Sequence, residues 1–238
     1  MDSPADIFSR SETLLGKEGL DKLAAAKIIV FGVGGVGSWC AEALVRTGVG
    51  HLTLVDPDEV CYSNINRQLP ATTETVGRPK VEVLRERFLS INPHADIQAV
   101  HGAFHAENAE NFHLEEYDYV IDAIDSLEDK AELILAASKL ENVTLFSSMG
   151  AAKKLDPTMI RTAEFWKVHG CPLAKALRTR FKKTKRFPEK KFLCVFSEEK
   201  GLPGAEKGSL MHITAMFGLQ LVSLVINHSI NTINNTQS

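Results

Sequence analysis

The four cysteines of this 238-residue chain include no Cys-X-X-Cys pair. Widely spaced thiols, in a chain with no recognisable secretory signal at its start, indicate a reducing, cytoplasmic setting rather than a disulfide framework. The same spacing excludes a structural zinc held tetrahedrally by two close thiolate pairs. The cysteines stand at Cys40, Cys61, Cys171 and Cys194.

The chain also lacks a strong excess of charge of either sign. It has 27 Lys and Arg against 30 Asp and Glu, which gives a net charge of −3 and a pI near 6.3. These values are ordinary for a globular protein and argue against one that is basic overall. Any contact with nucleic acid must therefore be local.

No apolar run is long and uninterrupted enough to predict a membrane span. The longest, at 210–230, is broken by several polar residues. Its apolar residues recur every three or four positions, which predicts a buried helix packed on a sheet. We expect the polar tail at 231–238 to fray. The apolar stripe consists of Leu210, Ile213, Phe217, Leu221 and Leu224.

Strand-like and helix-like segments alternate along the first part of the chain. This rhythm predicts one α/β domain with a Rossmann-like, doubly wound, mostly parallel sheet, with its core at 8–150. After Ser148 the rhythm breaks, and 151–230 is expected to form a C-terminal α+β extension. The predicted strands are 27–31, 51–56, 95–102, 117–123, 143–147, 158–165 and 192–197, and the predicted helices are 35–47, 78–92, 106–112, 126–140 and 172–184.

A glycine-rich loop, Gly32-Val-Gly-Gly-Val-Gly37, follows the first predicted strand and includes Gly34 and Gly35. The first glycine permits a tight turn, the second lets the backbone approach a phosphate, and the last lets the next helix lie near the strand. Asp56 ends the second strand, where it can accept hydrogen bonds from ribose hydroxyls. Asp58 stays open between such a role and a solvated loop charge.

Residues beyond the second strand favour a triphosphate over a redox dinucleotide. Reaction at a triphosphate builds charge that calls for fixed cations and a carboxylate-held metal. Arg67 and Lys80 supply the cations, and Asp125, at the carboxyl end of the fourth strand, can hold Mg²⁺. Each could be an ordinary surface or cap residue, but together they predict a site for ATP and Mg²⁺.

Over residues 8–150 the chain resembles the ubiquitin-activating-enzyme-like superfamily of the ThiF and MoeB type. The matching pieces are Phe-Ser-Arg at 8–10, GVGGVGS at 32–38, SNINRQ at 63–68, GRPK at 77–80 and DAIDS at 122–126. The resemblance implies that Asp56 contacts the ribose, Arg67 and Lys80 the phosphates, and Asp125 the metal. It further implies that Asn64 and Gln68 line the site, and that Arg10 reaches the phosphates bound by a neighbouring subunit. A homodimer follows from that last role.

Within the superfamily, the second half resembles the tRNA threonylcarbamoyladenosine dehydratase branch, which cyclises a threonylcarbamoyl group beside the anticodon through an acyl-adenylate. The alternatives are adenylation of the C-terminal glycine of a ubiquitin-like sulfur carrier and a non-catalytic nucleotide-binding module. Cysteine-desulfurase or sulfur-acceptor proteins are further expected partners. Cys171 stands where that branch often has Asp. It is either a thioester-forming nucleophile activated by Lys175 and Arg178 or a non-catalytic cysteine.

A basic segment at 175–191 stands out in this slightly acidic chain. Glu189 is its one acidic residue, and Phe181 and Phe187 are interleaved with the cations. The segment predicts contact with a tRNA phosphate backbone, with an aromatic ring available to stack on a base. The alternative is a solvated helix face. The cations are Lys175, Arg178, Arg180, Lys182, Lys183, Lys185, Arg186, Lys190 and Lys191.

Overall fold

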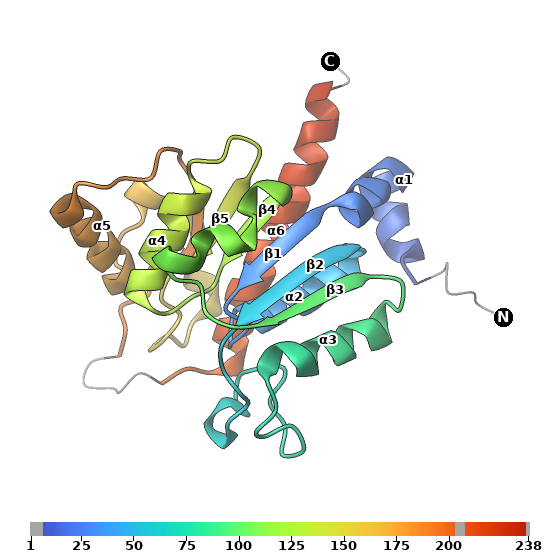
Figure 1. Cartoon of the computed structure of the whole chain (residues 1–238), viewed down its shortest axis with the longest axis horizontal. Coiled ribbons are helices and arrows are strands. Elements are labelled where there is room, and N and C mark those ends of the chain that lie inside the picture. Colours follow the sequence, from blue (N-terminus) through green and yellow to red (C-terminus); the bar gives the residue numbers. More distant parts are fainter. Residues whose placement is uncertain (1–6, 203–207, 237–238) are drawn as a thin grey trace.

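The computed structural model describes residues 7–202 and 208–236, with side chains described as far as Ile230. One sheet runs through this part of the chain (Figure 1). Its strands are β1 (Lys27–Phe31), β2 (His51–Asp56), β3 (Asp96–His101), β4 (Tyr119–Asp122), β5 (Thr144–Ser148), β6 (Ile160–Glu164) and β7 (Leu193–Ser197). They lie in the order β3-β2-β1-β4-β5-β7-β6, and among the described strands β6 alone runs antiparallel to its neighbour. The predicted doubly wound, mostly parallel sheet is confirmed, and both extension strands join it.

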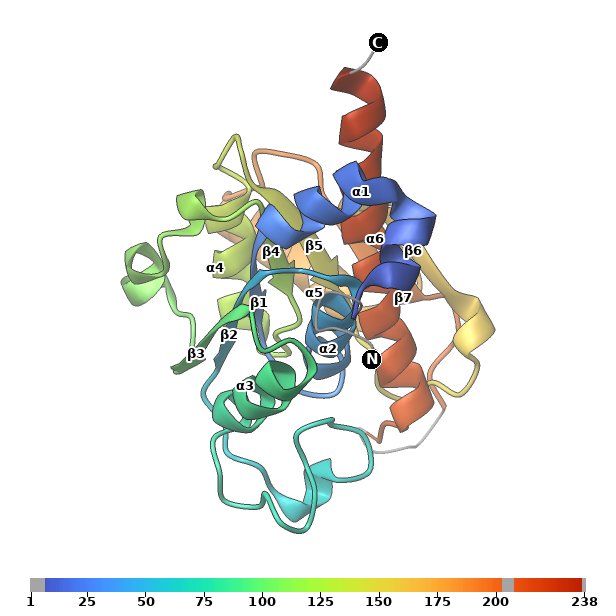
Figure 2. The same cartoon turned by 90° about the vertical axis from the view of Figure 1, so that its right-hand side faces the viewer.

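Helices cover both faces of the sheet. They are α1 (Ser9–Ala25), α2 (Gly37–Thr47), α3 (Lys80–Ile91), α4 (Leu127–Ala137), α5 (Pro172–Thr184) and α6 (Met211–Thr236). Figure 2 shows α2 and α6 on one side of the strands and α4 on the other. One buried cluster joins the sheet to α2, α3 and α6, and a second joins it to α4 and α5. The chain is thus built in three layers.

Alternate residues of the central strand β1 supply the two clusters. Ile28 and Val30 belong to the cluster with α2 and α6, whereas Ile29 and Phe31 belong to the cluster with α4 and α5. All four side chains are buried. A strand covered on both faces has no solvent side, so its sequence is apolar throughout instead of alternating.

The predicted strands and helices agree with the structure apart from their ends, with two differences. The segment predicted as a helix at 106–112 is a 3-10 helix, η3 (Ala106–Phe112). The sequence pattern does not predict α1, because Gly16 kinks the helix at φ 71° and it buries few residues. A short amphipathic stretch interrupted by a kink leaves a weak helical period.

Helix α6 packs closely along α2. Ile213, Phe217 and Leu221 are fully buried as predicted, whereas Leu210 is exposed and precedes the helix. Gly218 makes the close approach possible, because a Cβ at that position would lie 2.5 Å from the carbonyl oxygen of Val36. The helix therefore lies directly against the residues that open α2, beside the glycine loop.

Among the described helices, α6 is the one that is long and apolar enough to cross a membrane. Half of that stretch, Met211–Ile230, is buried within the protein, as in the core helix of a globular fold. The fraying of 231–238 stays a prediction: α6 extends to Thr236, and residues 237–238 lie outside the described part. Once packing has nucleated a helix, each further residue adds a backbone hydrogen bond at little cost.

The carboxyl ends of β1 and β4 mark the point where the sheet changes its direction of growth. From β1 the chain builds β2 and β3 on one side, and it then returns to build β4 and β5 on the other. Ligands of open α/β sheets bind at such a point. The loops after β1, β2 and β4 meet at this edge, and they carry the glycine loop, Asp56 and Asp125.

Candidate functional site

The glycine loop turns so tightly that two of its positions exclude any side chain. Gly32 has φ 82°, and a Cβ on it would lie 2.7 Å from the carbonyl oxygen of Ala123, in the loop after β4. A Cβ on Gly37 would overlap the carbonyl oxygen of Gly32. These two glycines hold the loop against β4 and bring the start of α2 under it, as the sequence predicts.

The middle of the loop is open by comparison. A Cβ on Gly34 would meet Nε2 of Gln68 at 3.6 Å, and one on Gly35 would meet Thr214 of α6 at 3.2 Å. Gly34 therefore leaves room for about one small group beside Gln68, and we call this space, before the first turn of α2, the hollow at Gly34. A backbone hollow at a helix N-terminus is suited to a phosphate group.

Asp56 fastens the glycine loop to the end of β2. Its Oδ2 atom accepts the N–H of Val33 at 2.7 Å, and its Oδ1 atom accepts the N–H of Asp58 at 2.9 Å. Burial raises the pKa of the Asp56 carboxyl, although Lys80 and the two backbone N–H groups act to lower it. The carboxylate thus lies beside the loop, where a ribose would follow the phosphates.

Lys80 opens α3 and reaches the same place. Its Nζ atom lies 2.7 Å from Oδ2 of Asp58 and 3.8 Å from Oδ1 of Asp56, and its side chain is almost completely buried. Asp58 is thus an exposed ion-pair partner of the lysine, and both alternatives left by the sequence, a ligand contact and a solvated loop charge, stay open. The lysine is thus held next to the Asp56 carboxylate.

Arg67 is fixed by a network that the sequence does not predict. Its guanidinium donates to the carbonyl oxygen of Ser63 at 2.8 Å and to Oδ1 of Asn66 at 2.9 Å. The carbonyl oxygen of Arg67 accepts the indole N–H of Trp39, on α2, at 3.0 Å. The Asn66 amide also donates to the carbonyl oxygen of Ser209, just before α6. Asn66 belongs to the SNINRQ motif and Trp39 directly follows GVGGVGS. Their place in or next to these motifs is the one feature of the sequence that points to them.

Gln68 and Asn64 follow the same loop. Gln68 is buried, and its Oε1 atom is the one buried side-chain oxygen or nitrogen in the described part that has no hydrogen-bond partner. An unpaired polar atom beside a glycine hollow fits a site that a polar ligand completes. Asn64 instead accepts the backbone N–H of Cys61 with its side chain, so it holds the turn η2 (Tyr62–Asn64).

Asp125 lies in the loop between β4 and α4. Its side chain is exposed, and it makes no hydrogen bond or ion pair with the described residues. Ser126, the next residue, caps α4 by accepting the N–H of Asp129. No group of three His, Cys, Asp or Glu residues in the described part could hold a metal. A single free carboxylate still fits Mg²⁺, which binds through one or two carboxylates together with substrate phosphates.

Arg10 lies away from this edge of the sheet. It is exposed in the first turn of α1. Its neighbour Phe8 packs at Gly48, where ring atoms lie 3.6 Å from the position of an added Cβ. Gly48 lies in the turn that leads from α2 to the amino end of β2. This end of the strands is opposite the glycine loop. Arg10 therefore lies at the edge of the sheet opposite the glycine loop of its own chain, and Figure 1 shows α1 at that end of the strands.

Cys171 lies directly before α5 and is buried in the cluster of α4 and α5. Its sulfur lies 3.9 Å from where a Cβ on Gly150 would be. Arg178, expected as an activating cation, instead donates to the carbonyl oxygens of Val168 and Phe165. An enclosed thiol without that partner favours the non-catalytic alternative.

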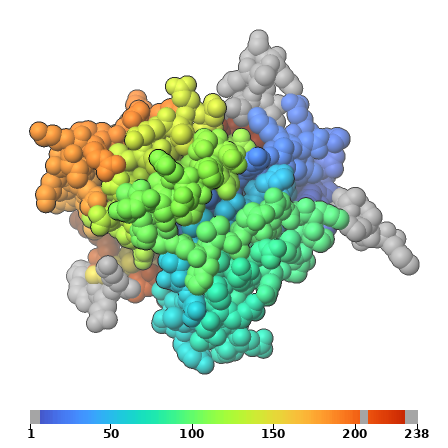
Figure 3. Space-filling model, viewed as in Figure 1, coloured from blue at the N-terminus to red at the C-terminus, as the bar shows by residue number. Residues whose placement is uncertain are grey.

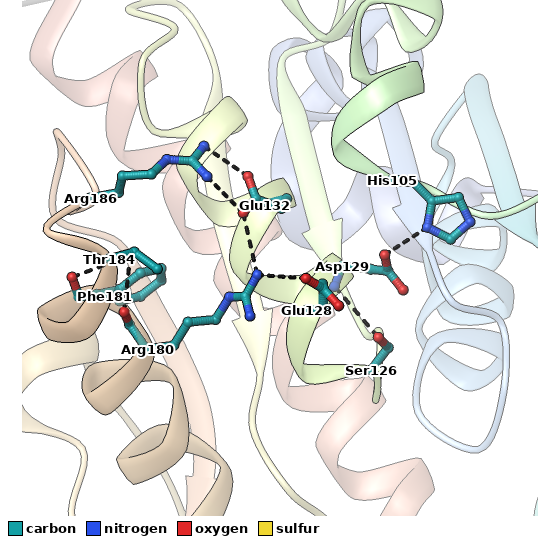
Figure 4. A network of polar contacts seen from close by, with 9 residues as sticks. All are labelled: His105, Ser126, Glu128, Asp129, Glu132, Arg180, Phe181, Thr184 and Arg186. Carbon is teal, nitrogen blue, oxygen red and sulfur yellow. Dashed lines mark hydrogen bonds and ion pairs between the residues drawn. The ribbon is translucent and has the colours of Figure 1, made fainter.

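The basic segment forms α5 and the turn after it, beside α4 on the surface shown in Figure 3. Figure 4 shows that two of its arginines face carboxylates of α4. Arg180 lies 2.8 Å from Glu128, and Arg186 makes two bonds of 2.8 Å to Glu132. These arginines therefore fasten α5 to α4. The uncompensated charge rests on the lysines, of which Lys182, Lys183 and Lys185 are exposed.

Comparison with known proteins places this geometry in a family. A family model described as the ThiF family matches residues 8–237. The tRNA threonylcarbamoyladenosine dehydratase of Haemophilus influenzae is 39% identical and covers 95% of this chain and 94% of its own length, and that of Bacillus subtilis is 46% identical and covers 74% and 69%. The Escherichia coli enzyme of the same name, solved in complex with ATP, aligns with a TM-score of 0.90 and 37% identity over 97% of this chain and 96% of that chain.

The hollow at Gly34 gives a direct test of the site. In Gly34→Ala the added methyl group makes only ordinary contact with Gln68, so the variant should melt like the wild type. The methyl group would occupy the space for a phosphate, and ATP affinity should fall by about tenfold or more, or at least 1.4 kcal/mol. Calorimetric titration with ATP measures the loss.

Gly102→Ala is the matched control, because a Cβ there would meet nothing within 4 Å. It should leave both the melting temperature and the ATP affinity unchanged. Wild-type ATP affinity in Gly34→Ala would show that no phosphate binds in this hollow.

Proposed function

Because this chain belongs to the ThiF family, we propose that it is the ATP-dependent enzyme that dehydrates threonylcarbamoyladenosine in tRNA, beside the anticodon. One observation carries the proposal. Dehydratases of that name align with nearly the whole chain, including the C-terminal extension, and one of them binds ATP. The sulfur-carrier alternative has less support, because the chain has no Cys-X-X-Cys pairs.

The chemistry requires a carboxylate to become a better electrophile. The threonyl carboxylate of the modified adenosine attacks the α-phosphate of ATP, and pyrophosphate leaves. The neighbouring carbamoyl group then attacks the resulting acyl-adenylate, so that the ring closes and AMP leaves. Both reacting groups belong to one substrate, which gives a high effective concentration and needs no enzyme nucleophile. A buried Cys171 agrees with this direct route.

The chain's own residues bind the nucleotide and stabilise the charge that develops on it. Asp56 accepts hydrogen bonds from the ribose, and the glycine loop gives the phosphates access to the N-terminus of α2. Arg67 and Lys80 donate their remaining N–H groups to phosphate oxygens while Asn66 and Asp58 hold them in place. Their fixed positive charge stabilises the negative charge that develops on the phosphates as pyrophosphate leaves.

Asp125 holds Mg²⁺ in this proposal. Its carboxylate is exposed at the edge where the phosphates would lie, and a hard cation shared between one carboxylate and phosphate oxygens is the common arrangement for Mg²⁺. The ion would supply further positive charge to the leaving pyrophosphate.

We place the enzyme in the cytoplasm, where its tRNA substrate is found, and we expect it to act as a homodimer. The support for the dimer is the position of Arg10, which is exposed on α1 at the edge opposite its own glycine loop. A cation there is available to the phosphates of another subunit and not to those of its own. Cysteine-desulfurase or sulfur-acceptor partners stay a prediction from the resemblance.

The acceptor assay separates the two enzymatic alternatives. Purified protein is incubated with ATP and Mg²⁺, and release of AMP and pyrophosphate is followed. We expect release with tRNA that carries threonylcarbamoyladenosine, and none with the same tRNA lacking the modification. Release with a ubiquitin-like sulfur carrier alone would favour the alternative function.

Subunit mixing tests the role of Arg10. Arg10→Ala and Asp125→Ala chains, each inactive alone, are co-expressed with different tags. If Arg10 acts on the neighbouring subunit, each mixed dimer contains one complete site, and about a quarter of wild-type turnover should return on random pairing. Turnover that stays at background in purified mixed dimers would contradict an action of Arg10 across the interface and place it in its own chain's site.

Salt dependence tests the tRNA surface. In the variant Lys182→Gln, Lys183→Gln and Lys185→Gln, the slope of log affinity against log salt should flatten by roughly 2 to 3, since each lost phosphate contact removes about 0.7–0.9. ATP affinity should not change. The matched control replaces Lys17, Lys27 and Arg85, which are exposed on α1, β1 and α3, by Gln. An equal slope of log affinity against log salt in the two triple variants would show that the basic segment is a solvated helix face.

A further inference from the structure

A completely buried ion pair lies behind the site and has no part in the reaction described above. Nζ of Lys130, on α4, lies 2.8 Å from Oδ2 of Asp122, at the end of β4, and both side chains are fully enclosed. The lysine stands among the apolar residues that α4 turns toward the sheet. Among the ion pairs of the described residues, it is the one in which neither partner has any exposure.

Such a pair is a poor way to stabilise a fold. Removing two charges from water is costly, and apolar residues of similar volume usually serve stability as well or better. A buried pair is better suited to hold neighbouring groups in one defined geometry. The groups that it holds are therefore informative.

The pair holds both backbone polar groups of one residue, Ile124. Oδ1 of Asp122 accepts the Ile124 N–H at 3.1 Å, and Nζ of Lys130 donates to the Ile124 carbonyl oxygen at 3.0 Å. Ile124 directly precedes Asp125. The peptide that leads into the exposed carboxylate is thus held at both ends by buried charge.

The pair is itself anchored in the sheet. Oγ of Ser147, on β5, donates to Oδ2 of Asp122 at 2.6 Å, and the two residues are paired neighbours on adjacent strands. On the other side of the loop, Ala123 donates to the carbonyl oxygen of Phe31 on β1 at 2.8 Å. The loop is thereby tied to both neighbouring strands, whereas the Asp125 side chain makes no polar contact with the described residues.

We infer that the Lys130–Asp122 pair positions Asp125 for the metal and the phosphates by fixing the backbone of Ile124. Lys130 is a positioning residue and touches neither the nucleotide nor the metal. This inference rests on the proposed function, in which Asp125 holds Mg²⁺. Groups that orient metal ligands from behind typically change metal affinity by about 10- to 100-fold when they are removed.

The test removes both charges together, so that no unpaired charge is left in the core. In Lys130→Met with Asp122→Asn, Mn²⁺ affinity in the presence of a non-hydrolysable ATP analogue should fall by about tenfold or more. Hydrogen exchange at the Ile124 amide should become faster, while exchange in β1 stays unchanged. Turnover should lose kcat and leave the KM for tRNA unaltered, as expected when tRNA contacts are intact.

Leu133→Ala is the matched control, because Leu133 is fully buried on the same helix and makes no bond to the loop. It should lower the melting temperature yet keep wild-type Mn²⁺ affinity in the folded protein. An equal loss of Mn²⁺ affinity in this control would overturn the inference. If the double variant does not fold, Ser147→Ala removes one bond to Asp122 and should shift both readouts in the same direction by less.

The measurements also separate this inference from the proposed function. Wild-type protein that binds Mn²⁺ with the analogue but releases no AMP with modified tRNA would contradict the function alone. Unchanged Mn²⁺ affinity and unchanged Ile124 exchange in a folded variant would overturn the positioning role alone. Wild-type protein that binds no Mn²⁺ with the analogue would overturn it as well, because Asp125 would have no metal to receive.

Discussion

The contact between Gly32 and Ala123 sets the distance between the two halves of the sheet. At position 32 an added Cβ would lie 2.7 Å from the Ala123 carbonyl oxygen, and the backbone there has φ 82°, so only glycine is accommodated without strain. This close approach brings the loop after β1 against the loop after β4. It thereby brings the loops that carry Gly34 and Asp125 to the same edge of the sheet, from strands that the chain reaches about ninety residues apart along a doubly wound path.

Each charged group at this edge is already held in place by a partner of the chain's own. Lys80 is paired with Asp58, Arg67 is held by Asn66, and the loop before Asp125 is held by Lys130. Groups fixed before the reaction do not have to be ordered during it, which is the main advantage of a preorganised site. The exceptions are Asp125 and the Oε1 atom of Gln68, which have no partner among the described residues. These are the positions where a ligand and a metal add the most.

Local patterns predict those parts of the structure that depend on neighbours in sequence. The continuous apolar runs of β1 and β2, the glycine loop and the cap at Ser126 are of this kind. Long-range pairings leave no such pattern: the ion pairs that join Arg180 and Arg186 to α4 span more than fifty residues. Because of these ion pairs, Arg180 and Arg186 join α5 to α4 and are less available to a nucleic acid than the sequence predicts. In the sequence, Lys130 is a polar residue on the apolar side of a predicted helix. Its burial is explained only by its ion pair with Asp122, which the sequence pattern does not predict.

The loss of water from the modified nucleoside is the central step of the proposed reaction. The most direct measurement is mass spectrometry of nucleosides from tRNA that has been incubated with the protein, ATP and Mg²⁺. We expect the mass of threonylcarbamoyladenosine to fall by one water as AMP appears in equal amount. Release of AMP while the nucleoside keeps its mass would contradict the proposed function, because water would then have hydrolysed the acyl-adenylate and no ring would have closed.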